Sequence, residues 1–214
     1  MKFYGQCGQD RFLESKIFKG MQNGYFVDVG AHDGLTINNS YYFEKNNKWQ
    51  GICIEPIPSI FDKLEKNRDC ICLNLAIDNK DGIADFYLNT GQTEMLSGLK
   101  AHYDPRHEER KNKAINKMGG DSNIVPIKTT KLSTILRDHN VTHVNYLSID
   151  VEGGEMAVLE SIDYNATFID IIDFEANYPD TADQIVKYLE NNNFKFLTKL
   201  GHDIIMINKD SCFL

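Results

Sequence analysis

The stretch VDVGAHDG, residues 27–34, joins an apolar run to a turn that contains two glycines. It predicts a buried strand that ends at about Asp28, a turn through Gly30 and Gly34, and a helix that begins near Thr36. Glycine adopts backbone conformations that other residues avoid, and it lets a ligand approach the main chain closely. We therefore take this stretch as the centre of the fold and of a ligand site.

The alternation of apolar runs and helix-like segments continues on both sides of this stretch. In the first half the segments are GYFVDVG (24–30), INNSYYFEKN (37–46), GICIEP (51–56), PSIFDKLEKN (58–67) and CICLNLAI (70–77). In the second half they are NYLSIDVEGG (145–154), a helix over 156–162, FIDIIDFEAN (168–177), a helix over 181–192, FKFLTKL (194–200) and HDIIMIN (202–208). The runs lack polar alternation, which is typical of parallel strands covered by helices on both faces. We expect a doubly wound α/β sheet whose last two strands form an antiparallel hairpin.

The chain has 214 residues, which favours one domain over residues 1–214. We expect residues 1–23 to form an N-terminal cover segment. Residues 91–122 are polar and mixed in charge, and the run HYDPRHEERKNKAINKMGG within them predicts a charged helix closed by Gly119 and Gly120. This insertion is interpreted as a lid over a bound acceptor; the alternative is a solvated surface helix.

The chain carries 23 Lys and Arg against 31 Asp and Glu, a net charge of −8, with a pI near 5.2. This charge opposes binding to nucleic acid or to anionic lipid, so we expect a small-molecule or glycan partner. The sequence contains no apolar run of membrane-spanning length and no secretory signal, so we expect a cytoplasmic protein without a membrane partner. Oligomeric state is not decided by these features.

Glu55 follows the next apolar run, 27 positions after Asp28. A carboxylate at the end of that strand can bind both hydroxyls of a ribose, whereas Asp28 can accept a hydrogen bond from a ligand ammonium group. The alternative for Glu55 is a helix-start carboxylate before Pro56. Together the two acids favour a ribose-bearing cofactor, either S-adenosylmethionine (SAM) or NAD. The glycine turn lacks the G-x-G-x-x-G spacing of dinucleotide sites, which argues against NAD.

Acidic side chains also follow two strands of the second half. Asp150 and Glu152 lie two residues apart, so we expect them on the same side of the chain, where like charge and burial raise one pKa toward that of a general base. Their alternative is N-capping of the next helix. Glu175 ends the following strand and, with Asp150, could deprotonate a hydroxyl or hold Mg²⁺. His32 is an alternative base, or a histidine hydrogen-bonded within its turn.

These blocks together resemble the FkbM family of SAM-dependent methyltransferases. The resemblance runs from about residue 24 to residue 208 and is carried by VDVGAHDG, IEPIP, NLAIDNKDG, TTKLSTIL and LSIDVEGGEMAVLESI, the last of which is similar to the family's D-x-E-G-x-E signature. The opening FYGQCGQDRFL is similar to an S-Q-x-G-Q-D segment of one branch, with Gly5 in place of the usual Ser. The resemblance implies a Rossmann-like class I methyltransferase fold, with a seven-stranded, mostly parallel sheet, an antiparallel last strand and helices on both faces.

The resemblance also implies a set of cofactor contacts: Gln9, Asp10, Asp28, Gly30, Ala31, His32, Gly34, Glu55, Asn74, Ala76, Ile77 and Asp150. In this set the turn that starts at Asp28 holds the methionine part of SAM and Glu55 holds the ribose. Asn74, Ala76 and Ile77 lie against the adenine. Gln9 and Asp10 close over the cofactor, and LSGL, residues 96–99, lies near the acceptor.

The function implied is O-methylation of a hydroxyl on a small molecule or carbohydrate, with a sugar or glycan favoured. Asp150 is the expected base, Glu175 its partner or a ligand of a divalent metal, and His32 the alternative base. Two other functions stay open at this point: an NAD-dependent oxidoreductase, and a catalytically silent SAM-fold module that acts through protein contacts.

Overall fold

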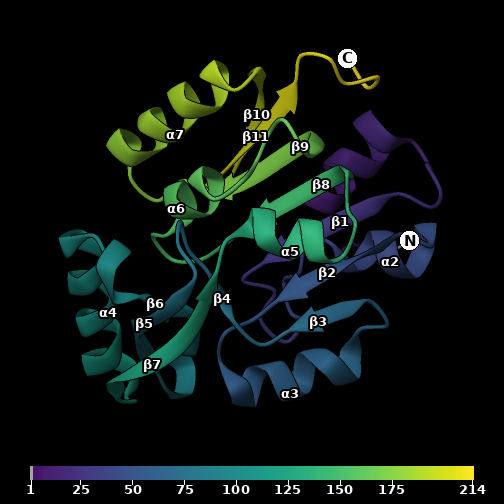
Figure 1. Ribbon diagram of the computed structural model, residues 1–214. Helices are drawn as coiled ribbons and strands as arrows, with labels where there is room; N and C mark the ends of the chain where they lie inside the picture. Colours follow the sequence, from purple (N-terminus) through teal and green to yellow (C-terminus); the bar gives the residue numbers. More distant parts are fainter. Residues whose placement is uncertain (1) are drawn as a thin grey trace.

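A seven-stranded sheet forms the centre of the computed structural model, which describes residues 2–214 (Figure 1). Its strands are β1 (Tyr25–Val29), β2 (Gln50–Ile54), β3 (Ile71–Leu73), β8 (His143–Ile149), β9 (Phe168–Glu175), β10 (Phe194–Leu200) and β11 (Asp203–Asn208). The order across the sheet is β10-β11-β9-β8-β1-β2-β3, and only β11 runs antiparallel to its neighbours. The expected mostly parallel sheet with an antiparallel last strand is therefore confirmed.

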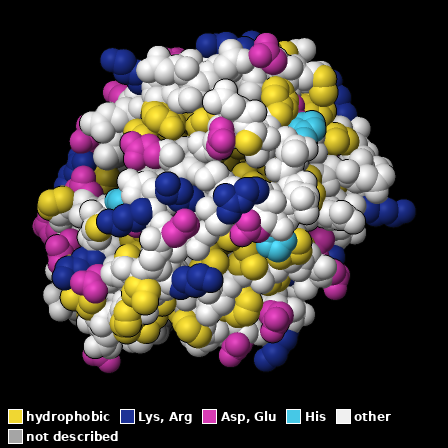
Figure 2. All heavy atoms as spheres, in the orientation of Figure 1, with side chains coloured by type: hydrophobic (Ala, Val, Ile, Leu, Met, Phe, Trp, Pro, Cys, Tyr) yellow, Lys and Arg dark blue, Asp and Glu magenta, His cyan; other side chains and the backbone are white. Residues whose placement is uncertain are grey.

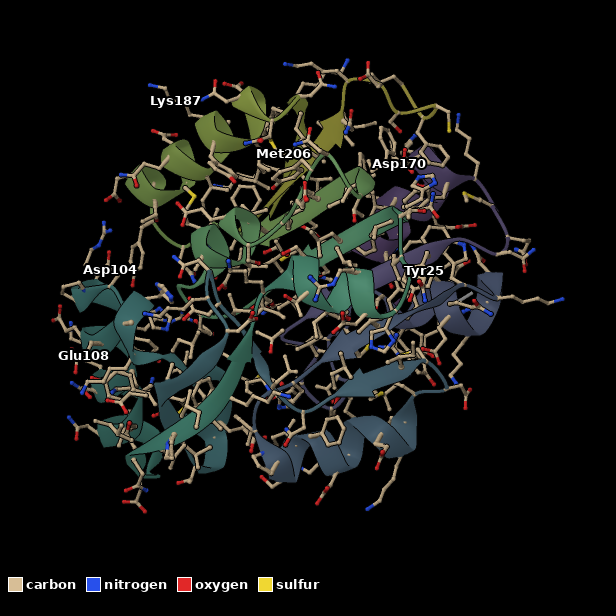
Figure 3. The ribbon with its side chains drawn as sticks, viewed as in Figure 1. Tyr25, Asp104, Glu108, Asp170, Lys187 and Met206 are labelled. Atoms are coloured by element: carbon tan, nitrogen blue, oxygen red, sulfur yellow. The ribbon has the colours of Figure 1, made fainter. Side chains whose placement is uncertain are left out.

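Helices cover both faces of this sheet because successive strand residues point to opposite sides. On one face Val27 packs with the helices α5 (Leu132–Asp138), α6 (Glu155–Glu160) and α7 (Pro179–Asn191). On the other face Phe26 packs with the π-helical turn η1 (Leu13–Phe18), which continues the short helix α1 (Gln9–Phe12), and with α2 (Tyr41–Asn47) and α3 (Pro58–Asn67). The helix α7 is amphipathic: Met206 is buried beneath it, whereas its own Lys187 points to solvent (Figure 3).

A second sheet of four strands, in the order β4-β7-β5-β6, lies beside the first. Its strands are β4 (Ala76–Ile77), β5 (Gly82–Asn89), β6 (Gly98–Leu99) and β7 (Ser122–Thr130), and the 3-10 turns η2 (Gly91–Leu96) and η3 (Lys100–His102) and the helix α4 (Pro105–Met118) lie between β5 and β7. The single strand expected over 70–77 is wrong, because the chain leaves the first sheet after β3 and enters the second at β4. Asn74 holds this transition by donating from Nδ2 to the carbonyl oxygens of Glu55 (2.8 Å) and Pro56 (3.1 Å).

The helix expected from Thr36 begins only at Tyr41. The Asp33 carboxylate accepts hydrogen bonds from the backbone N–H groups of Leu35 (2.9 Å) and Thr36 (2.7 Å), so a side-chain-bonded turn occupies this position. Ile37 then adopts a φ of 46°, a left-handed conformation that a β-branched residue rarely enters and that a right-handed helix cannot contain. The loop between the glycine turn and α2 is therefore irregular.

The buried guanidinium of Arg68 ties this loop to the sheet. Arg68 donates from Nε to Glu44 Oε2 (2.6 Å), from Nη1 to Asn38 Oδ1 (3.1 Å) and from Nη2 to Ser40 Oγ (3.0 Å). Asn38 and Ser40 in turn donate to Asp28 Oδ2, at 2.9 and 2.5 Å. Arg68 therefore contacts Glu44 directly and is linked to Asp28 through Asn38 and Ser40, which lie in the loop between the two acids.

The surface shows the mixture of charges expected from the composition. On the face in Figure 2, Lys and Arg side chains are interspersed with Asp and Glu, a pattern typical of a solvated surface. Within residues 2–214, no helix has the length and apolarity needed to cross a membrane.

Replacing Arg68 tests the network that holds the loop. Arg68→Met should lower the free energy of unfolding by about 3–5 kcal/mol, because it leaves buried Asp28 and Glu44 without their cation. Urea denaturation measures the change. Lys63→Met, an exposed change in α3, the helix that Arg68 directly follows, should stay within about 0.5 kcal/mol of the wild type. Equal stability of Arg68→Met and Lys63→Met would show that the network does not stabilise the fold.

Candidate active site

A cavity of about 200 Å³ lies at the carboxyl ends of β1, β2, β8 and β9. Ligands of doubly wound sheets bind at this edge. Nine of the residues expected in the site line it: Asp28, Gly30, Ala31, His32, Glu55, Ala76, Ile77, Asp150 and Glu175. Four do not: Gln9, Asp10, Gly34 and Asn74.

The glycine turn is held tightly between its two neighbouring strands. The backbone N–H groups of Gly30 and Ala31 both donate to Ile54 O at 3.0 Å, and Asp150 N donates to Val29 O at 2.9 Å. Gly30 has a φ of 86°, and a Cβ built there would lie 1.8 Å from Asp150 O. Only glycine fits, so the turn lies directly against the residue expected to be the base.

Two acceptor groups at the end of β1 are available to a ligand ammonium group. Within residues 2–214, the hydrogen bonds of Asp28 both go to Oδ2, which leaves Oδ1 free, and burial raises the pKa of Asp28 although Arg68 opposes this effect. Asn39 donates from Nδ2 to Ser148 Oγ (3.3 Å), while its Oδ1 is buried without a partner among the described residues. The sequence analysis missed Asn39; the signal was the polar run INNS directly after the glycine turn.

Glu55 is almost fully buried beside the same turn. Its Oε2 accepts from His32 N (3.1 Å) and its Oε1 from Ile57 N (2.8 Å), the residue that precedes α3. Burial raises the pKa of Glu55 to about 7, against the lowering effect of these two bonds. A carboxylate has about four acceptor positions, so both oxygens keep capacity for a ligand. Glu55 is therefore able to bind ribose hydroxyls, and its Oε1 also accepts a hydrogen bond at the start of α3.

An apolar slot adjoins Glu55. Ile57, Ala76 and Ile77 line it together with Phe86 and Leu99 from the second sheet. The slot exists because β4 leaves the first sheet, so its two residues face a different neighbour from those of β3. Its apolar lining suits a flat aromatic base.

Two residues expected in the site support it from behind. Asn74 holds the loop after β2, and Gly34 lies against α3, where a Cβ would meet Leu64 at 2.5 Å. Both positions are therefore explained by packing, and contact of Asn74 or Gly34 with a cofactor stays a prediction.

The N-terminal segment reaches the cavity through a residue other than the two expected. Gln9 and Asp10 are fully buried. Gln9 Nε2 donates to Asp203, and Asp10 Oδ2 accepts from Tyr4 N (2.6 Å). Gln6 lines the cavity instead. Closure of this segment over a cofactor stays a prediction.

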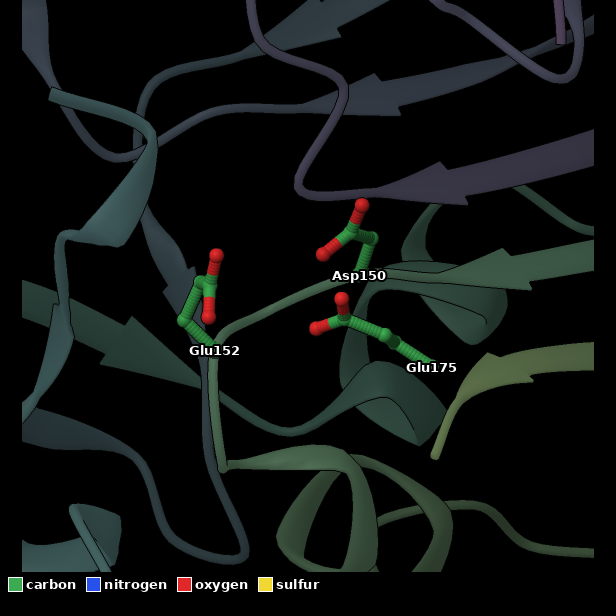
Figure 4. A group of neighbouring side chains, drawn as sticks. All are labelled: Asp150, Glu152 and Glu175. Carbon is green, nitrogen blue, oxygen red and sulfur yellow. The ribbon is translucent and has the colours of Figure 1, made fainter. Parts of the chain in front are cut away.

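Asp150, Glu152 and Glu175 form an acidic cluster on the wall of the cavity, and Figure 4 shows their carboxylates close together. One oxygen from each lies within 4.8 Å of the others. The alternative of N-capping is wrong for both Asp150 and Glu152, because Gly154 precedes α6 and no side chain caps it. Asp150 and Glu152 are therefore not engaged in capping α6.

The cluster shifts its own proton affinities. The pKa of Asp150 is raised well above its ordinary value, first because the surrounding protein reduces its hydration and then because Glu175 and Glu152 carry like charge. Asp150 is nevertheless an exposed residue on the wall of the cavity. Burial and then Glu152 raise the pKa of Glu175 to about 8. A base is most effective when its pKa lies near the working pH, so this pair suits proton transfer near neutrality.

The helix α4 brings two basic side chains, His107 and Arg110, to the cluster. His107 Nε2 lies 2.9 Å from Glu152 Oε2, and Arg110 Nη1 lies 3.6 Å from the same oxygen. The sequence analysis identified the charged helix but assigned no side chain to the site. The only sequence signal was the run of charges, which does not tell a solvated face from a contacting one.

His32 lies on the cavity wall with a φ of 50°. Its Nδ1 is 3.7 Å from Asp33 Oδ1 within the glycine turn, whereas its Nε2 is 3.3 Å from Glu94 Oε1 of η2, outside the turn. This contact joins the turn to the 91–122 segment. The function of that segment as a moving lid stays a prediction, because the structure shows its position and not its motion.

The chain is similar to known methyltransferases. The model of the Methyltransferase FkbM domain family matches residues 28–196. The chain is 27% identical over 168 residues to methyltransferase sdnD of Sordaria araneosa, a match that covers 66% of this chain and 61% of that protein. The crystal structure of methyltransferase FkbM from Methylobacillus flagellatus KT matches with a TM-score of 0.54 and 11% identity, over 86% of this chain and 43% of that one. The match thus spans about three fifths of its curated relative, and the structural likeness shows a shared fold.

The raised pKa values of the site predict a pH dependence of stability. Glu55 and Glu175 have pKa values of about 7 and 8 in the folded chain against ordinary values of 4.5, so the folded state binds more protons than the unfolded state between these limits. Their stabilisation is present below pH 4.5 and is lost as the pH rises through 7 and 8. Urea denaturation in this range should show stability falling with pH.

Glu175→Gln should flatten this dependence at its upper end, whereas the exposed Glu65→Gln should leave it unchanged. The same slope in the wild type and in Glu175→Gln would show that Glu175 does not titrate in this range.

Proposed function

The chain belongs to the FkbM methyltransferase domain family, and on that premise we propose that it transfers a methyl group from SAM to a hydroxyl of a sugar or glycan. The observation that carries the proposal is one continuous cavity with an ammonium acceptor, a ribose-binding acid, an apolar slot and an acid cluster. These four features correspond in order to the parts of SAM and to the place where an acceptor hydroxyl must lose its proton.

The residues of the cavity fit SAM. The buried, unpartnered Oδ1 of Asn39 and the free Oδ1 of Asp28 suit the ammonium group of the methionine part. Glu55 suits the ribose hydroxyls, and Ala76 and Ile77 suit the adenine. An unpaired buried acceptor costs about 1–3 kcal/mol, and a bound donor at Asn39 would remove that cost.

The side chains of the acidic cluster suit removal of a proton from the acceptor hydroxyl. When bound, SAM supplies a methyl group on a sulfonium sulfur for in-line displacement by an oxygen, which depends mainly on alignment. Asp150 accepts the hydroxyl proton, because its carboxylate opens into the cavity and its pKa is raised. Glu175 lies beside it and keeps the pKa high.

The rival functions have weaker support. An NAD site is disfavoured by the spacing of the glycine turn. A silent module is disfavoured because the acids of the site converge instead of scattering. A divalent metal is the alternative use of the cluster, since three carboxylates suit Mg²⁺. His107 and Arg110 already lie against Glu152, however, which favours proton transfer over metal binding.

Cofactor affinity tests the assignment of Glu55. Glu55→Ala should weaken binding of SAM and of S-adenosylhomocysteine by about 1–3 kcal/mol, because buried ribose hydroxyls lose their partner. Isothermal titration calorimetry measures both ligands, and Glu65→Ala on the exposed face of α3 is the matched control. Unchanged affinity in Glu55→Ala would remove this residue from the cofactor site.

Methyl transfer tests the assignment of Asp150. Asp150→Asn keeps the side-chain shape but cannot take a proton, so transfer should fall about 10²–10⁴-fold while cofactor affinity stays constant. Mass spectrometry of methyl glycosides incubated with labelled SAM measures transfer. Activity that survives in Asp150→Asn and is lost in His32→Ala would assign the base to His32. Loss of wild-type activity with EDTA, restored by Mg²⁺, would assign the acids to a metal.

A further inference from the structure

A second cavity, of about 230 Å³, adjoins the acidic cluster at Glu175. It is enclosed by residues 101–107, by the loop before α6 and by the start of α7. Glu175 lines both cavities, so a ligand in the second can present one group to the cluster. The cavity is at the small end of ligand sites, which typically measure about 300–1,000 Å³, and it suits one ring-sized unit.

In the wall formed by residues 101–107, the side chains of His102, Tyr103 and Asp104 are paired within the protein, whereas the buried Nε2 of His107 has no hydrogen-bond partner among the described residues. His102 Nε2 lies 2.8 Å from Asp78 Oδ1, and Tyr103 donates from its hydroxyl to Leu96 O. Asp104 Oδ1 accepts from Arg106 N at 2.7 Å and thereby caps α4. His102, Tyr103 and Asp104 are therefore held by internal contacts and are not free to bind a ligand.

At the opposite wall, at the start of α7, three polar side chains keep hydrogen-bonding capacity for a ligand: the half-buried Asn177 and Tyr178 and the exposed Gln184. Within residues 2–214, the amide of Gln184 and the hydroxyl of Tyr178 make no hydrogen bond. Asn177 uses only Nδ2, which donates to Glu175 Oε2 at 2.5 Å. The ring of Tyr178 is held in place by the Arg106 guanidinium, 4.1 Å from its centroid. Two amides and a phenol can both donate and accept, which is what a ligand with several hydroxyl groups requires.

The charges around the second cavity disfavour an anionic ligand. Among the described residues, its acidic and basic lining side chains are Asp104, Glu155 and Glu175 with His102 and His107, and no Lys or Arg. A phosphate or carboxylate would be repelled there. Asp104 is already paired with Arg106 at 2.7 Å and Glu155 accepts from Gly153 N at 3.0 Å, so these acids are also poor partners for a ligand cation.

We infer that this second cavity is the acceptor subsite, and that it takes one uncharged, polyhydroxylated ring held by Asn177, Tyr178 and Gln184 with a hydroxyl directed at Glu175 and Asp150. The inference rests on the proposed function, since it places the acceptor of that same transfer. It adds a prediction of charge: a neutral glycoside unit binds and a phosphorylated sugar does not.

Saturation-transfer difference NMR tests this assignment on the full chain saturated with S-adenosylhomocysteine. The probes are methyl α-D-glucopyranoside, methyl α-D-mannopyranoside, methyl α-L-rhamnopyranoside, methyl β-D-galactopyranoside and glucose 1-phosphate. At least one methyl glycoside should bind, and glucose 1-phosphate should bind at least about tenfold more weakly than it. Gln184→Trp fills the cavity and should abolish glycoside binding. Lys187→Trp, on the same helix but pointing to solvent, should retain it (Figure 3).

The outcomes separate this inference from the proposed function. Glycoside binding that survives in Gln184→Trp, binding of no glycoside, or stronger binding of glucose 1-phosphate would each overturn the inference while leaving cofactor binding intact. Failure of the wild type to bind S-adenosylhomocysteine by calorimetry would overturn the proposed function itself. Equal affinity of both Trp variants for S-adenosylhomocysteine shows that each has folded.

Discussion

The close approach of Gly30 to the backbone of Asp150 is the constraint on which the site depends. A side chain at position 30 would overlap Asp150 O, at 1.8 Å, so only glycine lets β1 and β8 end side by side. The same contact places the turn that would hold the methionine part of SAM next to the residue that would take the proton. Close packing of the backbone therefore sets the position of the glycine turn relative to Asp150.

The electrostatics of the site are distributed over separate parts of the fold. Arg68 neutralises Asp28 and Glu44 behind the glycine turn, whereas α4 brings His107 and Arg110 to Glu152. Among residues 2–214, Asp150 and Glu175 form no salt bridge with a Lys, Arg or His, and their pKa values are raised. The cations of the site thus contact Glu44 and Glu152, whereas Asp150 and Glu175 keep the raised pKa values that proton transfer requires.

The sequence by itself determined the first-order fold and identified most of the acids that line the cavity. The expected helix over 58–67 coincides with α3, and the expected hairpin of β10 and β11 is present. Asp150 and Glu175 were found because each follows an apolar run, and the carboxyl ends of parallel strands meet at one edge. Such features are local, because periodicity, glycine turns and strand ends depend on residues that are close together in the sequence.

Only the tertiary structure decided the features that depend on residues far apart in the chain. In the second sheet β4 pairs with β7, about fifty residues later in the chain, and no local sequence pattern predicts which strand β4 will pair with. The start of α2 was set by the Asp33 turn and by the strained Ile37, and the contact of α4 with Glu152 was set by how the two sheets pack. Sequence periodicity shows which face of a segment is buried, but the neighbour it meets there is chosen by long-range packing.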